Sequence, residues 1–305
     1  MIKSIAILLA LQATAARAAH TFTPATGVAA SVSVSITNGP AGTMRYVYRI
    51  ASGNGSTQDV REIYLLVPSS FSLSIGSPTN WDGGYVSPDN VVYWSPQTIE
   101  AMRAFGPNTS LSGFSLASPG VPDISKFLVR GNAPLPSFDE GDDSEPGWPD
   151  KYEDAVQVKT IVPSSFTATD PASAIDRLIS LKHQAASLSW IGNAEFVFKL
   201  DKRLDQARAA LAQNKKKLAG TRLTQFIRDL TGAYGEHGHE HGDKAGVRDD
   251  KDSRHPEKFV NDEAFQLLKI NAEFIISKLP TESADKDDDG GDSQDGGKSQ
   301  RRDEK

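Results

Sequence analysis

The sequence predicts an α+β protein whose two kinds of secondary structure lie in separate domains: an N-terminal all-β sandwich of immunoglobulin-like type and a C-terminal all-α helical bundle. Residues 31–36 and 44–50 alternate apolar and polar side chains with the period of two that is typical of strands. Residues 170–279 instead repeat apolar side chains every three or four positions, as amphipathic helices do. The pattern changes near residues 167–171, where we expect the domain boundary.

The predicted sandwich covers residues 21–166. Short runs rich in Val, Ile, Tyr and Phe are separated by turns of Gly, Pro, Asn and Ser, such as residues 38–42 and 53–56. A short helical pattern occurs among them at residues 98–104. Many short strands with turns of this composition are typical of a sandwich.

Four helices are predicted within residues 170–279. The first begins at Asp170-Pro171, a capping residue followed by proline. None is apolar all round, so each must bury one stripe against the others, and we expect Phe226 and Phe274 in that core. A polar insertion at residues 235–258 separates the third helix from the fourth. It has too few apolar residues to join a core, and we expect it to be disordered.

The apolar pattern of these helices resembles the FIMAH-type helical domain, which occurs at the ends of secreted bacterial and archaeal proteins. The resemblance extends over residues 173–279, about a third of the chain, and the insertion departs from a compact version of that domain. It implies an interaction or spacer domain without catalytic residues, and a generic stack of helical hairpins is the alternative. The matching positions are Leu200, Leu204, Ala207, Leu211, Leu223, Phe226, Ile227, Glu263, Ala264, Leu267, Asn271, Ala272 and Ile275.

Residues 1–18 have the features of a secretory signal peptide. Lys3 gives a positive start, residues 5–11 form a short apolar run, and Ala16-Arg17-Ala18 is a small-x-small cleavage site. The run is too short to span a bilayer, and no later stretch approaches the required length of about 20 apolar residues. We therefore expect an extracytoplasmic bacterial protein, periplasmic or secreted, with no membrane span after cleavage. An uncleaved anchor is the alternative.

The composition excludes several classes of function. A formal net charge of −6 gives no basic excess for nucleic acid, which we do not expect as a partner. Because the chain has no cysteine, it has neither thiol catalysis nor Cys-ligated metal sites. It contains no Gly-x-Ser-x-Gly, phosphate-binding Gly loop or His-Glu-x-x-His motif. Residues 280–305 are rich in Asp, Gly, Ser and Lys, and we expect a disordered acidic tail there.

A His-rich segment in the insertion is the sharpest candidate site. His237, His239 and His241 alternate with other residues in a Gly-rich stretch, and Asp243 or His255 could complete a site for zinc, nickel or copper. Solvated histidines in a disordered insertion are the preferred interpretation, because no rigid scaffold holds them.

Two acidic segments are weaker candidates for cation sites. Asp285, Asp287 and Asp289 match the start of a calcium-loop pattern, but Gly296 stands where the bidentate Glu should be. The carboxylates of residues 139–145 repel one another unless a cation bridges them. A solvated acidic segment is the preferred interpretation of both.

Aromatic residues of the β-region are candidates for a carbohydrate-stacking surface, although alternating aromatic residues in strands more often lie in the core. On the first helix, His183 follows Ile179 by four residues and is expected at the edge of the core. The aromatic candidates are Tyr46, Tyr48, Tyr64, Trp81, Tyr85, Tyr93 and Trp94.

These observations predict a non-enzymatic binding or interaction protein whose partner is a protein or carbohydrate of the cell envelope. No cofactor is expected unless the histidines bind a divalent metal. Two alternatives remain open: a metal-binding protein that uses the His-rich insertion, and a polysaccharide-active hydrolase of unrecognised type that uses the acidic loop.

Overall fold

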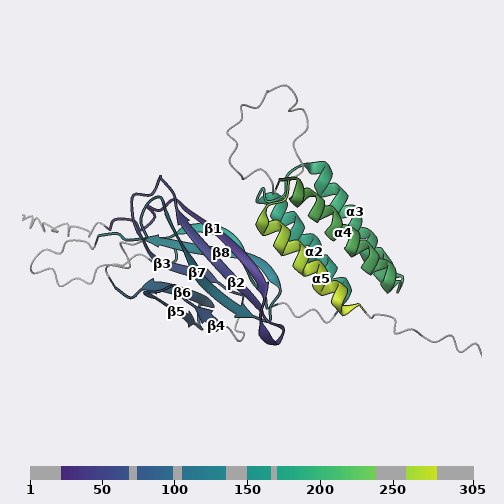
Figure 1. The fold of residues 1–305 in the computed structure, drawn as a ribbon, viewed down its shortest axis with the longest axis horizontal. Helices are drawn as coiled ribbons and strands as arrows, with labels where there is room; N and C mark the ends of the chain where they lie inside the picture. Colours follow the sequence, from purple (N-terminus) through teal and green to yellow (C-terminus); the bar gives the residue numbers. More distant parts are fainter. Residues whose placement is uncertain are drawn as a thin grey trace, which may run out of the picture.

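The computed structural model describes two antiparallel β-sheets and four helices, so the predicted α+β class is confirmed (Figure 1). The two sheets face each other, and the helices lie beside them at one side of the molecule. The described residues are 22–68, 74–98, 105–134, 150–165, 170–237 and 259–279.

One sheet has four strands in the order β1-β2-β7-β4. Its regular pairing is interrupted once, where Tyr48 pairs with Phe114 and Arg49 pairs with Ser112. Gly113 is left between them as a bulge, with a φ of +106° that glycine adopts without a steric penalty. The strands are β1 (Ala30–Asn38), β2 (Met44–Ser52), β4 (Ser74–Gly76) and β7 (Thr109–Ser118), and the turn η1 (Pro40–Gly42) joins the first two.

The other sheet has five strands in the order β5-β6-β3-β8-β9, also antiparallel. Its inward side chains alternate with outward ones, as expected for a sheet with one face on the core. The strands are β3 (Val60–Leu66), β5 (Trp81–Val86), β6 (Val91–Pro96), β8 (Pro122–Gly131) and β9 (Val156–Pro163).

Aromatic residues of both sheets fill the space between them. Tyr48 of β2 and Trp94 of β6 are fully buried and pack against Phe127 of β8. Their polar atoms bond across the gap, because a buried hydroxyl or indole N–H needs an acceptor. The Tyr48 hydroxyl donates to the carbonyl of Ile161 (3.0 Å), and the Trp94 indole donates to that of Gly76 (3.1 Å). Burial raises the pKa of Tyr48 well above its ordinary value, so it remains a donor.

The four helices predicted from the apolar spacing are present, as α2 (Pro171–Ser187), α3 (Ala194–Ala212), α4 (Lys216–His237) and α5 (Asp262–Lys278). Three of them begin with a side-chain cap. Asp170 accepts from the backbone N–H groups of Ala172 and Ser173, and Asn193 and Asn261 cap α3 and α5 in the same way. These hydrogen bonds, first that from the Ser173 N–H, hold the pKa of Asp170 below its ordinary value.

A buried polar network, which we call the Asn271 network, joins the helices to the sandwich. Asn271 of α5, 4% exposed, donates to the carbonyls of Pro122 (2.9 Å) and Leu267 (2.8 Å). Arg177 of α2 donates to the Asn271 side-chain oxygen (3.0 Å) and to the same Pro122 carbonyl (3.2 Å). It also forms an ion pair with Asp123 of β8 (3.0 Å).

Helix α5 also covers the edge of the four-stranded sheet. The Gln266 amide donates to the carbonyl of Val34 (3.0 Å) and accepts from the N–H of Ile36 (2.7 Å), as a neighbouring strand does. One apolar cluster extends through both sheets and the helices. The separation into two domains is therefore not confirmed, and residues 167–169 of the expected boundary lie outside the described residues.

We expect this shared core to make unfolding cooperative. Tryptophan fluorescence and far-ultraviolet circular dichroism should give coincident urea transitions. Asn271→Ala should lower the free energy of unfolding by about 1–3 kcal/mol, because it removes the buried partner of Pro122 and Arg177. Gln213→Ala, at an exposed position after α3, is the control and should change little. Two separate transitions in the unmodified protein would contradict the shared core.

The expectation that both phenylalanines lie in the helical core is right for Phe226 and wrong for Phe274. Phe226 is fully buried, whereas Phe274 is partly exposed and has the Lys278 ammonium 5.3 Å from its ring centre. Phe226→Ala should cost about 3–5 kcal/mol of stability, since it leaves a cavity. Phe274→Ala should cost about 1 kcal/mol, since its ring is only partly removed from water. Equal losses in urea denaturation would show that the two sites do not differ.

Candidate functional site

The predicted cation sites lie mostly outside the described residues. His237 is the last residue of α4, whereas His239, His241, His255 and residues 139–145 fall outside the described ranges. Asp285, Asp287 and Asp289 also fall outside them. Within the part of the chain that the structure describes, no three His, Asp or Glu residues are grouped to hold a metal ion. The metal and calcium sites therefore stay predictions.

The aromatic candidates do not form a common surface. Tyr46, Tyr48, Trp81 and Trp94 belong to the core between the sheets, as expected for alternating aromatic residues. The remaining three side chains lie elsewhere: Tyr64 is nearly buried in a second apolar cluster, and Tyr85 and Tyr93 are partly exposed.

The outer face of the five-stranded sheet carries a polar cluster whose members bind one another. Arg130 donates to Glu62 (2.5 Å) and to the backbone carbonyl of Asp154 (3.1 Å). The Tyr64 hydroxyl donates to the same Glu62 carboxylate (2.8 Å), and Tyr152 packs edge-on against the Tyr64 ring. Burial first, and then Glu62, raises the pKa of Tyr64. With its donors and acceptors paired, this cluster is a structural support for the sheet.

The outer face of the four-stranded sheet is different, and we call it the serine–arginine face. The register places Ser33 of β1 opposite Arg49 of β2, and Arg49 opposite Ser112 of β7. Thr37 pairs in the same way with Arg45. Alternation sends the buried apolar residues into the core and leaves mainly small hydroxyl side chains outside, together with the partly exposed Val47 and Ala51 of β2. The exposed members of the face are Ser31, Ser33, Ser35, Thr37, Arg45, Arg49, Ser110 and Ser112.

The serine–arginine face is positively charged in an acidic protein. Its four strands contain Arg45 and Arg49 and no Asp, Glu or Lys, although the whole chain has a net charge of −6. The Arg49 guanidinium donates from Nε and Nη2 to the Ser110 hydroxyl (3.1 and 2.8 Å), which holds it against the sheet. A guanidinium has five N–H groups, so the exposed Arg49 can bond to Ser110 and to an acidic ligand at the same time. The sequence shows each strand, but not that residues 109–118 lie beside β2 to build this face.

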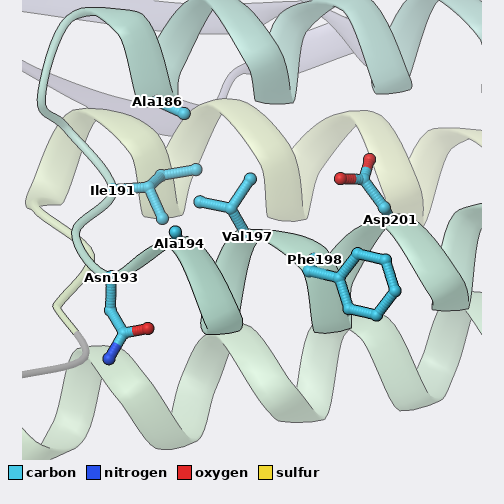
Figure 2. Close-up of a pocket in the computed structure, with 7 residues that line it drawn as sticks. All are labelled: Ala186, Ile191, Asn193, Ala194, Val197, Phe198 and Asp201. Carbon is cyan, nitrogen blue, oxygen red and sulfur yellow. The ribbon is translucent and has the colours of Figure 1, made fainter.

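A second surface feature is an open pocket at the corner between α2 and α3 (Figure 2). Its volume is about 370 Å³. Figure 2 shows the Ile191 and Val197 side chains pointing toward each other, with the Phe198 ring further along α3 near Asp201. Among the described residues two large apolar side chains are exposed: Phe198 is 71% exposed and Leu218 is 40% exposed. The pocket is lined by Ala186, Ile191, Asn193, Ala194, Val197, Phe198 and Asp201.

A buried lysine lies behind the rim of this pocket. The Lys182 side chain is fully buried and pairs with Asp201, which also lies 3.3 Å from the His183 ring. Burial lowers the pKa of Lys182. The expectation that His183 lies at the edge of the core is wrong, because its side chain is 57% exposed. Its neighbour Lys182 is the residue that points into the core. The sequence contains a signal for the burial of Lys182: it follows the buried Leu178 by four residues, so both side chains lie on the same face of α2.

Comparison with known proteins adds little to this geometry. No family model matches the sequence, and no curated protein matches it. The resemblance to FIMAH-type domains therefore stays a prediction. A solved structure of an uncharacterised protein from Nocardia farcinica, described as having an immunoglobulin-like fold, is similar to 44% of this chain and 98% of its own, with 9% identity and a TM-score of 0.29. So weak a likeness says nothing about function. No described helix is long and apolar enough to cross a membrane.

The buried lysine predicts a pH dependence of stability. Between the lowered pKa of folded Lys182 and its ordinary value of 10.5, the unfolded chain binds more protons than the folded one. Stability from this group should therefore rise with pH across that window. The free energy of unfolding, measured by urea denaturation, should rise from neutral pH to about 10.5 in the unmodified protein. In Lys182→Met this rise should be absent.

Lys199→Met is the matched control for this experiment. Lys199 also pairs with a carboxylate, that of Asp229, but its side chain is half exposed. The control variant should keep the alkaline rise. If both variants keep it, the burial of Lys182 does not affect stability in this range.

Proposed function

We propose that this is an extracytoplasmic, non-enzymatic binding protein whose serine–arginine face binds an anionic carbohydrate of the cell envelope. The observation that carries the proposal is the outward alignment of hydroxyl side chains and two arginines on an acid-free sheet. The leader at residues 1–18 supports the location.

The chemistry of the face suits a flat, acidic sugar polymer. Serine and threonine hydroxyls both donate and accept hydrogen bonds, as sugar hydroxyls do. The guanidinium groups bind carboxylates with two parallel hydrogen bonds, which adds direction as well as charge. Arg45 and Arg49 are four residues apart on β2, about 13 Å along the strand. Two acidic groups of one extended chain can therefore be bound at once.

The helices have a supporting role in this proposal. We infer that the β-strands form an immunoglobulin-like domain and that the helices form a separate FIMAH-like interaction or spacer domain. Gln266 and the Asn271 network attach α5 to the edge of the sandwich, beside β1. This attachment leaves the outward hydroxyl and arginine side chains of β1, β2 and the start of β7 exposed, whereas Ser115 further along β7 is buried.

Calorimetric titration with polygalacturonate, a carboxylated polysaccharide, and with neutral dextran tests the proposal. We expect binding of the acidic polymer alone, weakened by salt. Arg45→Ser with Arg49→Ser should weaken it at least about tenfold, because a hydrogen bond to a charged group is worth about 1.5–3 kcal/mol.

The control removes the same charge elsewhere. Arg61 on β3 and Arg228 on α4 are accessible to solvent, and Arg61→Ser with Arg228→Ser should leave the affinity nearly unchanged. Equal losses in the two double variants would show that net charge alone attracts the polymer. Failure to bind the polygalacturonate, or equal binding of dextran, would overturn the proposal.

A further inference from the structure

A second group of cations lies at the turn between α3 and α4. Lys215, Lys216 and Lys217, which we call the lysine tip, are all exposed. Residues 206–228 around them contain six Lys and Arg residues and no Asp or Glu. Helix α4 starts within the tip and has no acidic residue in its first turn, so the partial positive charge of its amino end adds to that of the lysines. This end of the helices is therefore positive in a chain whose net charge is −6.

The acidic side chains of α2 and α5 toward this end already have partners. Asp176 pairs with Arg208 (2.9 Å), and Glu273 pairs with Lys269 (3.8 Å). Asp170 accepts from the first backbone N–H groups of its own helix. These carboxylates are used locally, so the charge of the lysine tip stays accessible to a ligand from outside.

A defined turn holds the lysine tip in place. Asn214 has a φ of +57°, in the left-handed region that asparagine adopts more readily than most residues. Its N–H donates to the carbonyl of Leu211 (2.8 Å), and the N–H of Lys215 donates to that of Ala210 (2.8 Å). This pair of bonds is the Schellman ending of a helix, in which backbone donors satisfy the last carbonyls. The lysine ammonium groups are therefore not needed to cap α3.

An apolar side chain lies among these cations. Leu218 follows the lysine tip directly, in the first turn of α4, and is 40% exposed. The core stripe of this helix contains Ala219, Leu223 and Phe226, all fully buried. Because neighbouring residues of a helix point about 100° apart, burial of Ala219 holds Leu218 outside that stripe. The end of the hairpin thus presents three ammonium groups and a leucine together.

The hairpin also carries this group away from the rest of the molecule. In Figure 1 the turn between α3 and α4 lies at the right-hand end of these two helices, on the side away from both sheets. A flat surface can therefore approach the tip without meeting the sandwich.

We propose that the lysine tip and Leu218 bind the surface of a lipid bilayer that contains anionic lipids. Such a surface offers phosphate groups directly above a hydrocarbon layer. The lysine ammonium groups bind the phosphates, while their methylene chains and the Leu218 side chain enter the boundary below. An acidic polysaccharide or a free phosphate supplies the charge but no apolar layer for the leucine. The attachment is peripheral, since no described helix is long and apolar enough to cross a membrane.

Co-sedimentation of the full chain with lipid vesicles tests the proposal. The vesicles contain phosphatidylcholine alone, or phosphatidylcholine and anionic phosphatidylglycerol at about two parts to one. We expect binding to the mixed vesicles that is at least about tenfold weaker in about 1 M NaCl, where the screening length is about 3 Å. Binding to phosphatidylcholine alone should be weaker by at least as much. Glycerol 3-phosphate, a soluble head group, should not displace the protein at about 10 mM, which hardly changes screening in about 0.1 M salt.

A charge variant and its matched control locate the contact. Lys215→Gln with Lys216→Gln and Lys217→Gln should weaken binding to the mixed vesicles at least about tenfold, because each lysine near an anionic bilayer favours binding about fivefold. The control removes three exposed lysines elsewhere, and it should bind nearly as the unmodified protein does. Its changes are Lys126→Gln, Lys159→Gln and Lys202→Gln.

Changes at Leu218 test the apolar part of the contact. Leu218→Ser should weaken binding several-fold although the charge is unchanged, since less apolar area enters the bilayer. Leu218→Trp should bind at least as well as the unmodified protein. Its added fluorescence should be quenched by lipids brominated on their acyl chains, because the bromines reach only an indole that enters the hydrocarbon boundary.

The proposal is overturned if the charge variant and its control lose the same affinity, or if both kinds of vesicle bind equally. Displacement by glycerol 3-phosphate, or a Leu218→Trp signal that brominated lipids do not quench, would also overturn it. The charge variant should still bind polygalacturonate, so failure of the carbohydrate proposal can be told apart from failure of this one. An equal loss of polygalacturonate and of vesicle binding would make the tip a general anion site and overturn the lipid assignment.

Discussion

The Asn271 amide is the contact on which the arrangement of the molecule depends. Its nitrogen donates to a carbonyl of its own helix and to the carbonyl of Pro122, and its oxygen accepts from Arg177. Both N–H groups of the amide and its oxygen are therefore hydrogen-bonded, and the side chain is buried away from water. A buried amide that lost one of these partners would cost more than the bond contributes, so only one seating of α5 on β8 satisfies it. The rest of the fold is built around that seating.

Two consequences follow from the position of α5. Because it lies along the edge strand, Gln266 satisfies the backbone of β1 and the outer face of the sheet stays open. Because it packs against α4, it ends beside Gly220 in the first turns of that helix. One helix therefore covers the edge of the sheet at β1 and packs against the first turns of α4. The sequence of α5 explains this position, because the polar residues Gln266 and Asn271 make its contacts with β1 and β8.

The elements of this fold could be predicted from the sequence, whereas their pairing could not. Period-two alternation located the strands and the spacing of apolar residues located four helices, since both signals are local. The serine–arginine face is not local, because it needs Ser112 to lie beside Arg49 across more than 60 intervening residues. Such register depends on the whole sheet.

The helix core shows the same limit at the level of single residues. A hydropathy pattern assigns lysine to the surface and histidine to the boundary, yet Lys182 is buried and His183 is exposed. What decides the matter is Asp201, one helix away, which gives the ammonium group a partner. Phe274 was placed in the core because it follows the apolar spacing, but it lies at the margin of the stripe, where Lys278 covers it. The apolar spacing of a helix shows on which face a residue lies. How deeply that residue is buried depends on the elements that pack against this face.

The distribution of charge is the feature that folding explains least. Soluble proteins usually intersperse both signs over their surfaces, which favours solubility and costs nothing in stability. Here an acid-free sheet and an acid-free helix turn occur in one acidic chain. Serine opposite arginine contributes little to a sheet, and lysine at the start of a helix opposes its dipole. Residues chosen for stability would differ at both places. Both surfaces collect cations without an acidic residue beside them in the sequence, which is the pattern expected when part of the gain comes from an anionic partner.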